Sequence, residues 1–148
     1  MPIGPIVWLP AEHLNQLESL LRSNGLPVQD VAEQADIFCA IFDGDKLVAA
    51  GGLEAAGDDC LLRSVAVESS YRGQGLARAI TEFLLQQAQS MGRPAVYLLT
   101  ETAAQYFENL GFHQVSRAQV PATIARTRQF SSLCPDSASC LMTDLPRN

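Results

Sequence analysis

The spacing of apolar residues along this chain predicts both helices and strands. Four leucines between residues 14 and 21 recur at the period of an amphipathic helix, which Gly25 then ends. The same period runs from about Gly75 to Met91, and we expect shorter helices at residues 28–35, 102–110 and 121–128. Apolar runs bounded by Gly, Pro or Asp are typical of strands, and they fall at residues 3–9, 37–42, 46–54, 60–67, 95–100, 112–120 and 140–145.

The order of these elements predicts one mixed α/β domain that spans residues 1–148. Asp43-Gly44-Asp45 is typical of a hairpin turn between two antiparallel strands. The strand at residues 95–100 is apolar throughout, as expected for a central strand covered on both faces. This strand follows the long second helix, so hairpins and a strand–helix–strand unit are expected to share one sheet.

Composition narrows the classes of function. The chain has 148 residues, 47% of them apolar, and a formal charge of −6, which opposes nucleic-acid binding because such surfaces are basic. No apolar run approaches the roughly 18 residues of a transmembrane helix, and Met1-Pro2-Ile3-Gly4-Pro5 lacks the basic region of a signal peptide. We therefore expect a cytoplasmic protein with no membrane partner.

The four cysteines do not form the pattern of a disulfide framework.

The most informative segment links the strand at residues 60–67 to the long helix. A polar turn follows that strand, and then Arg72, Gly73 and Gly75 open the helix. The N–H groups and dipole of a helix N-terminus attract phosphate, glycines let phosphate oxygens approach the backbone, and an arginine adds a permanent charge. The segment is neither a P-loop nor a Rossmann fingerprint, since Arg78 holds the place of the third glycine. It predicts a diphosphate site, with an ordinary strand–turn–helix as the alternative.

Three motifs along the chain occur together: Arg72-x-x-Gly75-x-Ala77, residues 62–67 and Leu110-Gly111-Phe112. In that order they resemble the acetyl-CoA signature, the fourth strand and the late Gly-Phe turn of the GNAT family of N-acetyltransferases. The resemblance implies a mostly antiparallel mixed sheet of six or seven strands with helices on both faces. It also implies acetyl-CoA as cosubstrate, a small-molecule amine as acceptor, and a homodimer.

The C-terminal part of the chain adds a finer resemblance. Residues 98–103, 120–125, 130–135 and 139–142 are similar to the arsenic-resistance branch of this family. The branch implies a toxic, amino-acid-like acceptor.

The family resemblance also assigns roles to cofactor-binding residues. It implies that the strand residues Val65, Ala66 and Val67 pair with the pantetheine arm in the manner of an added strand. Arg78, one turn into the helix, reaches a phosphate or solvent, and Thr100 lies near the cofactor thiol. The residues expected around the diphosphate are Arg72, Gly73, Gln74, Gly75, Leu76 and Ala77.

The mechanism that the family implies is direct attack of a neutral amine on the acetyl thioester, which needs a base and an acid. The family's usual acid is a tyrosine, but its place is taken by Phe107. Tyr106 is the first substitute, with Thr100, Thr102 or a water as alternatives, or the thiolate leaves without an acid. Glu54 and Glu101, each at the end of a predicted strand, are the candidate bases, and the alternative for both is a solvated carboxylate.

Two further residues are candidates for binding the substrate. Arg63 lies inside an apolar strand, where a charge needs a partner, so it either reads an anionic group of the substrate or forms a salt bridge with an acid such as Glu54. Cys134, with Cys140, could bind a thiophilic species such as a trivalent arsenical, or both could be packing residues. No site for a resident metal ion is expected.

We therefore expect an acetyl-CoA-dependent N-acetyltransferase that acts on the primary amine of a small, amino-acid-like toxic compound. The alternative is a thiol-based arsenical-binding protein that keeps the same fold with little or no catalysis. Acetylation of a protein N-terminus ranks lower, because loops long enough to grip a peptide are not evident.

Overall fold

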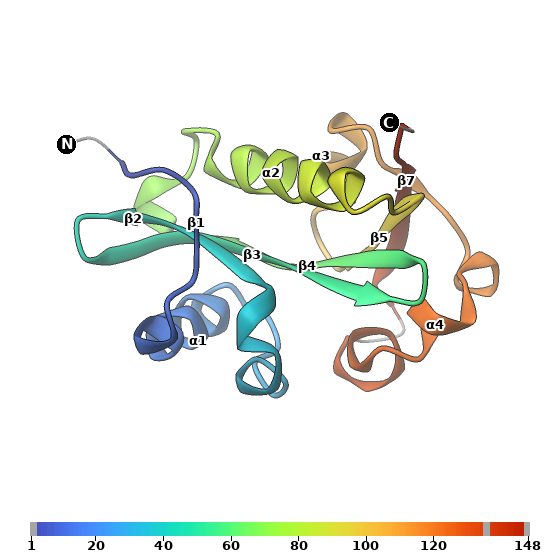
Figure 1. Cartoon of the computed structure of the whole chain (residues 1–148), viewed down its shortest axis with the longest axis horizontal. Helices are drawn as coiled ribbons and strands as arrows, with labels where there is room; N and C mark the ends of the chain where they lie inside the picture. The colour runs from blue at the N-terminus through green and yellow to red at the C-terminus, as the bar shows by residue number, and fades with distance from the viewer. Residues whose placement is uncertain (1–2, 135–136, 147–148) are drawn as a thin grey trace. The chain divides into compact units, whose positions relative to one another are not determined.

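Seven strands form one sheet in the computed structural model, which describes residues 3–134 and 137–146 (Figure 1). Their order is β1-β2-β3-β4-β5-β7-β6. The strands are β1 (Val7–Trp8), β2 (Phe38–Asp43), β3 (Lys46–Ala56), β4 (Asp59–Val67), β5 (Ala95–Thr100), β6 (His113–Gln114) and β7 (Ser139–Asp144). The α-helices are α1 (Leu14–Ser23), α2 (Leu76–Ser90), α3 (Ala104–Asn109) and α4 (Ala122–Ala125).

The chain divides into two compact units, and β3 and β4 contribute residues to both. One unit comprises Met1–Leu53 and Ser64–Leu84, and the other comprises Glu54–Arg63 and Leu85–Asn148.

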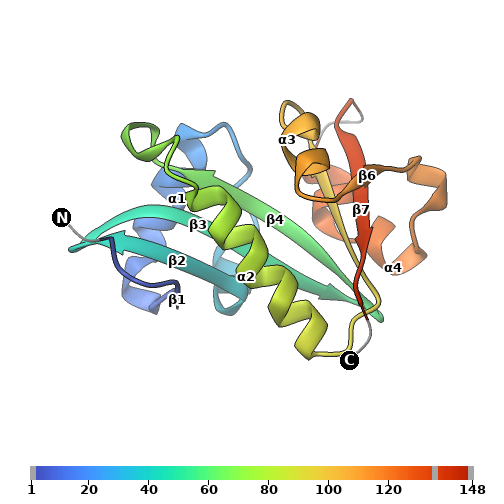
Figure 2. The same ribbon diagram turned by 90° about the horizontal axis from the view of Figure 1, so that it is seen from above.

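In the first unit, helices cover both faces of β2 and β3 (Figures 1 and 2). The faces are distinguished by two neighbouring residues of β3: Ala50 belongs to the cluster under α1, whereas a Cβ on Gly51 would lie 2.5 Å from Ile80 of α2. Gly51 therefore lets α2 approach the sheet closely. The buried cluster under α1 comprises Leu17, Leu20, Leu21, Val31, Phe38, Ala40, Leu47, Ala50 and Ala66.

In the second unit, β5 pairs antiparallel with β7, from Ala95 opposite Asp144 to Thr100 opposite Ser139. The pairing of β4 with β5 is parallel and joins Cys60 to Val96 and Leu61 to Tyr97. Side chains of β5 and β7 pack against α4 and the segment after it. This buried cluster comprises Ala56, Leu61, Ala95, Tyr97, Ile124, Phe130 and Cys140.

The structure confirms the predicted hairpin and the long second helix, but it corrects two strands. The strand expected at residues 3–9 is only Val7–Trp8, since the prolines at positions 5 and 10 have no N–H to donate to a ladder. The strand expected at residues 112–120 ends at Gln114. There Ser116 and Gln119 form a capping box that starts a 3-10 helix, Arg117–Gln119.

The structure also corrects two short helices. Residues 28–35 do not form a single helix; a 3-10 segment, Ala32–Ile37, contains a non-helical Gln34. The helix expected at residues 121–128 is α4 alone, followed by a π-helix, Gln129–Leu133. Within the described residues, no helix is both long and apolar enough to cross a membrane. Met1, Pro2 and Pro135, which belong to motifs named above, lie outside the described residues.

Candidate active site

The loop between β4 and α2 has the geometry of an anion site. Glu68 caps a short 3-10 helix, because its carboxylate accepts hydrogen bonds from the Ser70 N–H at 2.9 Å and from the Ser70 hydroxyl. These bonds lower the pKa of Glu68. Gly73 and Gly75 follow with φ of +83° and +80°, and nothing lies within 4 Å of where a Cβ would be on either. The two glycines thus take conformations that favour glycine and leave the space above the backbone open.

Helix α2 begins directly after this loop. Its first backbone bond runs from Ala79 N to Gly75 O at 3.0 Å, so the amides of residues 76–78 have no partner inside the helix. They carry the positive end of the helix dipole and can accept phosphate oxygens. The Arg78 side chain lies along the exposed surface of the helix, where its Nε is 3.2 Å from Glu82 Oε2.

Arg72 has a partner that the sequence analysis missed. Its guanidinium donates to the amide oxygen of Asn24, at the end of α1, at 3.0 Å. Tyr71, one residue earlier, donates from its hydroxyl to Asp43 at 2.5 Å. The sequence shows Asn24 only as a helix-end residue next to a glycine, and no local pattern indicates a contact with a residue 48 positions away.

Val65, Ala66 and Val67 form the end of β4, beyond the residues that pair with β5. Ser64, immediately before them, has a φ of 60° and is the one non-glycine residue with positive φ in the described part of the chain. That conformation interrupts the regular alternation of side chains along the strand. The remaining predicted diphosphate residues lie in the loop and first turn: Gln74 is exposed, and Leu76 and Ala77 are partly buried.

Glu54 and Arg63 are brought together at the beginning of the second unit. Arg63 Nη1 lies 3.1 Å from Glu54 Oε1, and the exposed fractions of the two side chains are 0% and 13% respectively. This is the salt bridge that the sequence analysis offered as the alternative reading of Arg63. The carboxylate is the more accessible partner, so Glu54 can meet a ligand more readily than the guanidinium. Their roles in base catalysis and substrate binding stay predictions.

Thr100 and Glu101 lie at the end of β5. The Thr100 hydroxyl accepts a hydrogen bond from the Ala103 N–H at 3.0 Å, which turns the chain toward α3. Thr100 is partly buried and Glu101 is exposed. The bond explains why a threonine suits this turn, and it leaves the proposed contact of Thr100 with a cofactor as a prediction.

On α3, the two candidate positions for an acid differ in burial. Phe107, in the place of the family's tyrosine, is 8% exposed and packs edge-on against Phe112, whereas Tyr106 is 39% exposed. The Tyr106 ring contacts Phe107 at a centroid distance of 5.4 Å. The hydroxyl-bearing side chain is therefore the accessible one, and its part in proton transfer stays a prediction.

The two C-terminal cysteines have different environments. Cys140 is buried in β7, and burial raises the pKa of its thiol to about 11 despite nearby Arg117. Cys134 is partly buried and its thiol donates to Gln129 Oε1 at 3.3 Å. In the part of the chain that the structure describes, no three His, Cys, Asp or Glu side chains gather as metal ligands would. A protonated, buried thiol at Cys140 is a poor ligand for a soft ion.

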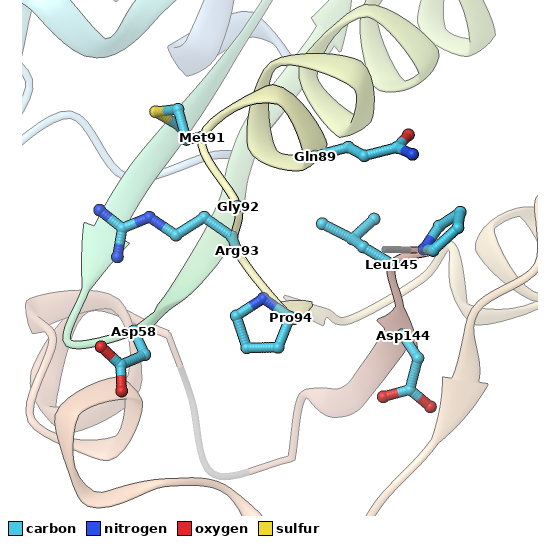
Figure 3. A pocket seen from close by; sticks show the side chains of 9 residues that line it. Asp58, Gln89, Met91, Gly92, Arg93, Pro94, Asp144 and Leu145 are labelled. Carbon is cyan, nitrogen blue, oxygen red and sulfur yellow. The ribbon is translucent and has the colours of Figure 1, made fainter. Parts of the chain in front are cut away.

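A pocket of about 750 Å³ lies in the second unit, and none of the residues predicted for the site lines it (Figure 3). The end of α2, the turn after it and the end of β7 line it with Met91, Arg93, Pro94, Asp144 and Leu145. Arg93 donates to Gly57 O, so its charge is anchored at the rim.

Comparisons with known proteins agree with this geometry. The model of the acetyltransferase (GNAT) domain matches residues 33–114, more than half of the chain. An amino-acid acetyltransferase of Mycobacterium tuberculosis is 31% identical over 106 residues, 70% of this chain and 53% of that protein. The citrate (pro-3S)-lyase ligase of Haemophilus influenzae is 30% identical over 107 residues, 71% of this chain and 30% of that one. The chain thus spans from about a third to about half the length of these curated relatives.

A solved structure extends the likeness to the whole fold. N-acetylglutamate synthase from Neisseria gonorrhoeae, in complex with coenzyme A and N-acetyl-glutamate, superposes with a TM-score of 0.85 and 15% identity. The match covers 99% of this chain and 36% of that one. The matched domain includes the β4–α2 loop and the strands on either side of it. The chain therefore belongs to the GNAT acetyltransferase family and has that family's mixed α/β fold.

Proposed function

We propose that the protein is an N-acetyltransferase that uses acetyl-CoA to acetylate the primary amine of a small, amino-acid-like compound. The observation that carries the proposal is the pair of left-handed glycines, with open space above them, at the N-terminus of α2. Membership of the GNAT family supports it independently.

The loop residues fit the diphosphate of acetyl-CoA. The amides of residues 76–78 point their N–H groups out of the helix end, and Arg72 adds a cation at the same loop. Val65, Ala66 and Val67 would bind the pantetheine arm through their backbone groups. Bound acetyl-CoA would supply an activated acetyl thioester. Gln74 and Arg78 complete the set of residues that would surround the phosphates.

The remaining candidates would move protons. Glu54 or Glu101 would accept the proton of the substrate ammonium, directly or through water, so that the neutral amine can attack the acetyl carbon. The carbon–nitrogen bond forms as the carbon–sulfur bond breaks, and the sulfur leaves as a thiolate. Tyr106, Thr100 or Thr102 would return a proton to that sulfur.

The relatives support an amino acid as acceptor. One curated relative is an amino-acid acetyltransferase, and a structural neighbour holds N-acetyl-glutamate. Arg63, beside Glu54, would bind the acceptor carboxylate, and Cys134, which belongs to the same compact unit, would be a further contact. The resemblance of the tail to the arsenic-resistance branch supports a toxic analogue as the natural acceptor.

The test measures acetyl-CoA binding by calorimetry for the wild type, Gly75→Ala and a matched control, Gly92→Ala. Both glycines have positive φ and open surroundings, so each alanine strains the backbone by a similar ~1–2 kcal/mol. Only Gly75→Ala places a methyl group where the diphosphate would lie. We expect Gly75→Ala to bind at least roughly tenfold more weakly and Gly92→Ala to bind as the wild type does. Equal affinities in the wild type and Gly75→Ala, or a wild type that does not bind, would refute the proposal.

A second experiment follows thiol release with a panel of amines. We expect turnover with amino acids and little with amines of the same size that have no carboxylate. Turnover confined to peptides, or to amines without a carboxylate, would contradict the proposed acceptor class.

A further inference from the structure

Three segments that are far apart in the sequence meet at the loop before α2, all within the first unit. Asn24 comes from the end of α1, Asp43 from the hairpin between β2 and β3, and Tyr71 and Arg72 from the loop itself. The loop is therefore held from two sides by side chains that no cofactor role accounts for.

Both the nitrogen and the oxygen of the Asn24 side-chain amide form hydrogen bonds. Its Nδ2 donates to Leu20 O at 2.9 Å and to Val67 O at 3.4 Å, which ties the end of α1 to the end of β4. Its Oδ1 accepts from Arg72 Nη2 at 3.0 Å. Because an asparagine amide is planar, bonds at the nitrogen fix the direction of the oxygen. The position of Arg72 is thus set by the same residue that joins α1 to β4.

The chemistry of this partner matters as much as its position. An amide oxygen is neutral, so it orients the guanidinium without cancelling its charge, whereas a carboxylate would form an ion pair with it. Arg72 is exposed, so a free side chain of this length would sample many rotamers in water. Asn24 limits that freedom and keeps the full positive charge for an anion.

A second anchor holds the residue before Arg72. The Tyr71 hydroxyl donates to Asp43 Oδ2, and Lys46 Nζ lies 5.4 Å from the centre of the Tyr71 ring. The backbone of the loop is thereby tied to the hairpin while the Arg72 side chain is tied to α1. Both anchors are formed by the protein alone.

We propose that Asn24 is a positioning residue that holds Arg72 in place for the diphosphate of acetyl-CoA. The inference rests on the proposed function, because it takes acetyl-CoA as the ligand of this loop. Asn24 itself acts through Arg72 and touches neither the acetyl group nor the acceptor.

The test compares three variants by calorimetric titration with acetyl-CoA. We expect Asn24→Ala to weaken binding roughly fivefold to tenfold, as expected when a hydrogen bond to a charged group is lost. Asn24→Asp keeps an oxygen near Arg72 but adds a competing negative charge, so it should bind at least as weakly as Asn24→Ala. The matched control is Ser90→Ala, which removes an equivalent hydroxyl bond, 2.8 Å long, from Ser90 to the Gln87 carbonyl at the end of α2 and leaves the Asn24–Arg72 contact unchanged. It should bind like the wild type.

Two further readouts separate positioning from a structural role. In an Arg72→Ala background, Asn24→Ala should change the affinity by less than about twofold, since the partner is already gone. In steady-state assays, Asn24→Ala should raise KM for acetyl-CoA while kcat and KM for the amine stay near their wild-type values.

The outcomes distinguish this inference from the proposed function. If the wild type binds acetyl-CoA and Gly75→Ala weakens that binding, but Asn24→Ala binds within twofold of the wild type, the positioning role is overturned and the function stands. Tighter binding by Asn24→Asp than by the wild type would also overturn it. A wild type that fails to bind acetyl-CoA would overturn both.

Discussion

The buried pair of Glu54 and Arg63 allows a quantitative prediction. The Arg63 side chain is 0% exposed, and its guanidinium lies 3.1 Å from the Glu54 carboxylate. Replacing Glu54 by leucine removes that carboxylate and leaves the charge of Arg63 buried. At that distance the attraction is about 5 kcal/mol for an effective dielectric constant near 20, but desolvation of both charges offsets much of it. What the variant measures is the cost of a buried charge that has lost its carboxylate, about 3–5 kcal/mol when one partner of a buried pair is removed. Because Arg63 has a further interaction besides Glu54, we expect the lower end, about 3 kcal/mol.

The reverse substitution should cost less. Arg63→Met leaves Glu54, whose side chain is 13% exposed and can reach water, and a carboxylate can also take up a proton, whereas a guanidinium stays charged. The double variant Glu54→Leu/Arg63→Met has no buried charge at this point, so it should unfold within about 1 kcal/mol of the wild type. The order of stability is thus wild type and double variant first, then Arg63→Met, then Glu54→Leu.

Urea unfolding followed by circular dichroism measures these differences, with the slope m as a check that the unfolded state has not changed. For a chain of this size, about 3 kcal/mol corresponds to a fall in Tm of roughly 6–12 °C. A loss below about 1 kcal/mol for Glu54→Leu would refute the reasoning. So would a double variant that is less stable than both single variants.

Three other predictions concern packing and thiols. Gly51→Ala should destabilise the fold by about 1–3 kcal/mol, because its Cβ would lie 2.5 Å from the buried Ile80 Cγ2. In an Ile80→Ala background most of this cost should vanish. An unchanged cost in that background, measured by urea unfolding, would contradict the contact. Stability should fall above pH 9: burial raises the pKa of Cys39 to about 12 and that of Cys140 to about 11, so the folded chain keeps protons that the unfolded chain loses near pH 9. Each thiol should contribute about 1.4 kcal/mol per pH unit, and a Cys39→Ala/Cys140→Ala variant whose stability declines as steeply as the wild type's would disprove this. Cys134, the partly buried cysteine, should react first with iodoacetamide at pH 8, and mass spectrometry that finds Cys140 labelled first would refute the assignment of exposure.

Much of the fold can be predicted from the sequence where the signal is local. The leucine period of α1, the Asp-Gly turn of the hairpin and the apolar run of β5 each determine an element by themselves. The turn of the glycine loop could be predicted for the same reason, since Gly73 and Gly75 themselves allow the positive φ values that it needs. These parts need no knowledge of distant contacts.

The elements that were mispredicted depend on competition between local patterns. The strand expected after Phe112 stops because Ser116 and Gln119 satisfy their own backbone groups in a capping box, and that box outweighs the apolar residues around it. Strand β1 is short because prolines flank it. In both cases the sequence contains the residues that end the strand, but the pattern of apolar residues alone does not show that they outweigh the tendency to form a strand.

Contacts between residues far apart in the sequence could not be predicted from local sequence patterns. The Asn24–Arg72 bond joins residues 48 positions apart, and either residue has an ordinary local explanation as a helix end or a solvated charge. The Glu54–Arg63 pair was foreseen as one of two alternatives, because a charge in an apolar strand demands a partner but does not say which one. Only three-dimensional packing decides between them.

Ser64 has a consequence for how this protein can diverge. Its left-handed φ of 60° tolerates glycine, asparagine or aspartate but strongly disfavours valine, isoleucine or threonine. The residue also interrupts the alternation of side chains between the two faces of the sheet, so this alternation starts anew after Ser64. Substitutions that change side chains before Ser64 therefore need not rotate Val65–Val67, and a descendant could acquire a new acceptor while inheriting unchanged the strand that we propose for pantetheine. A library randomised on one side of Ser64 at a time is the natural starting point for altering specificity.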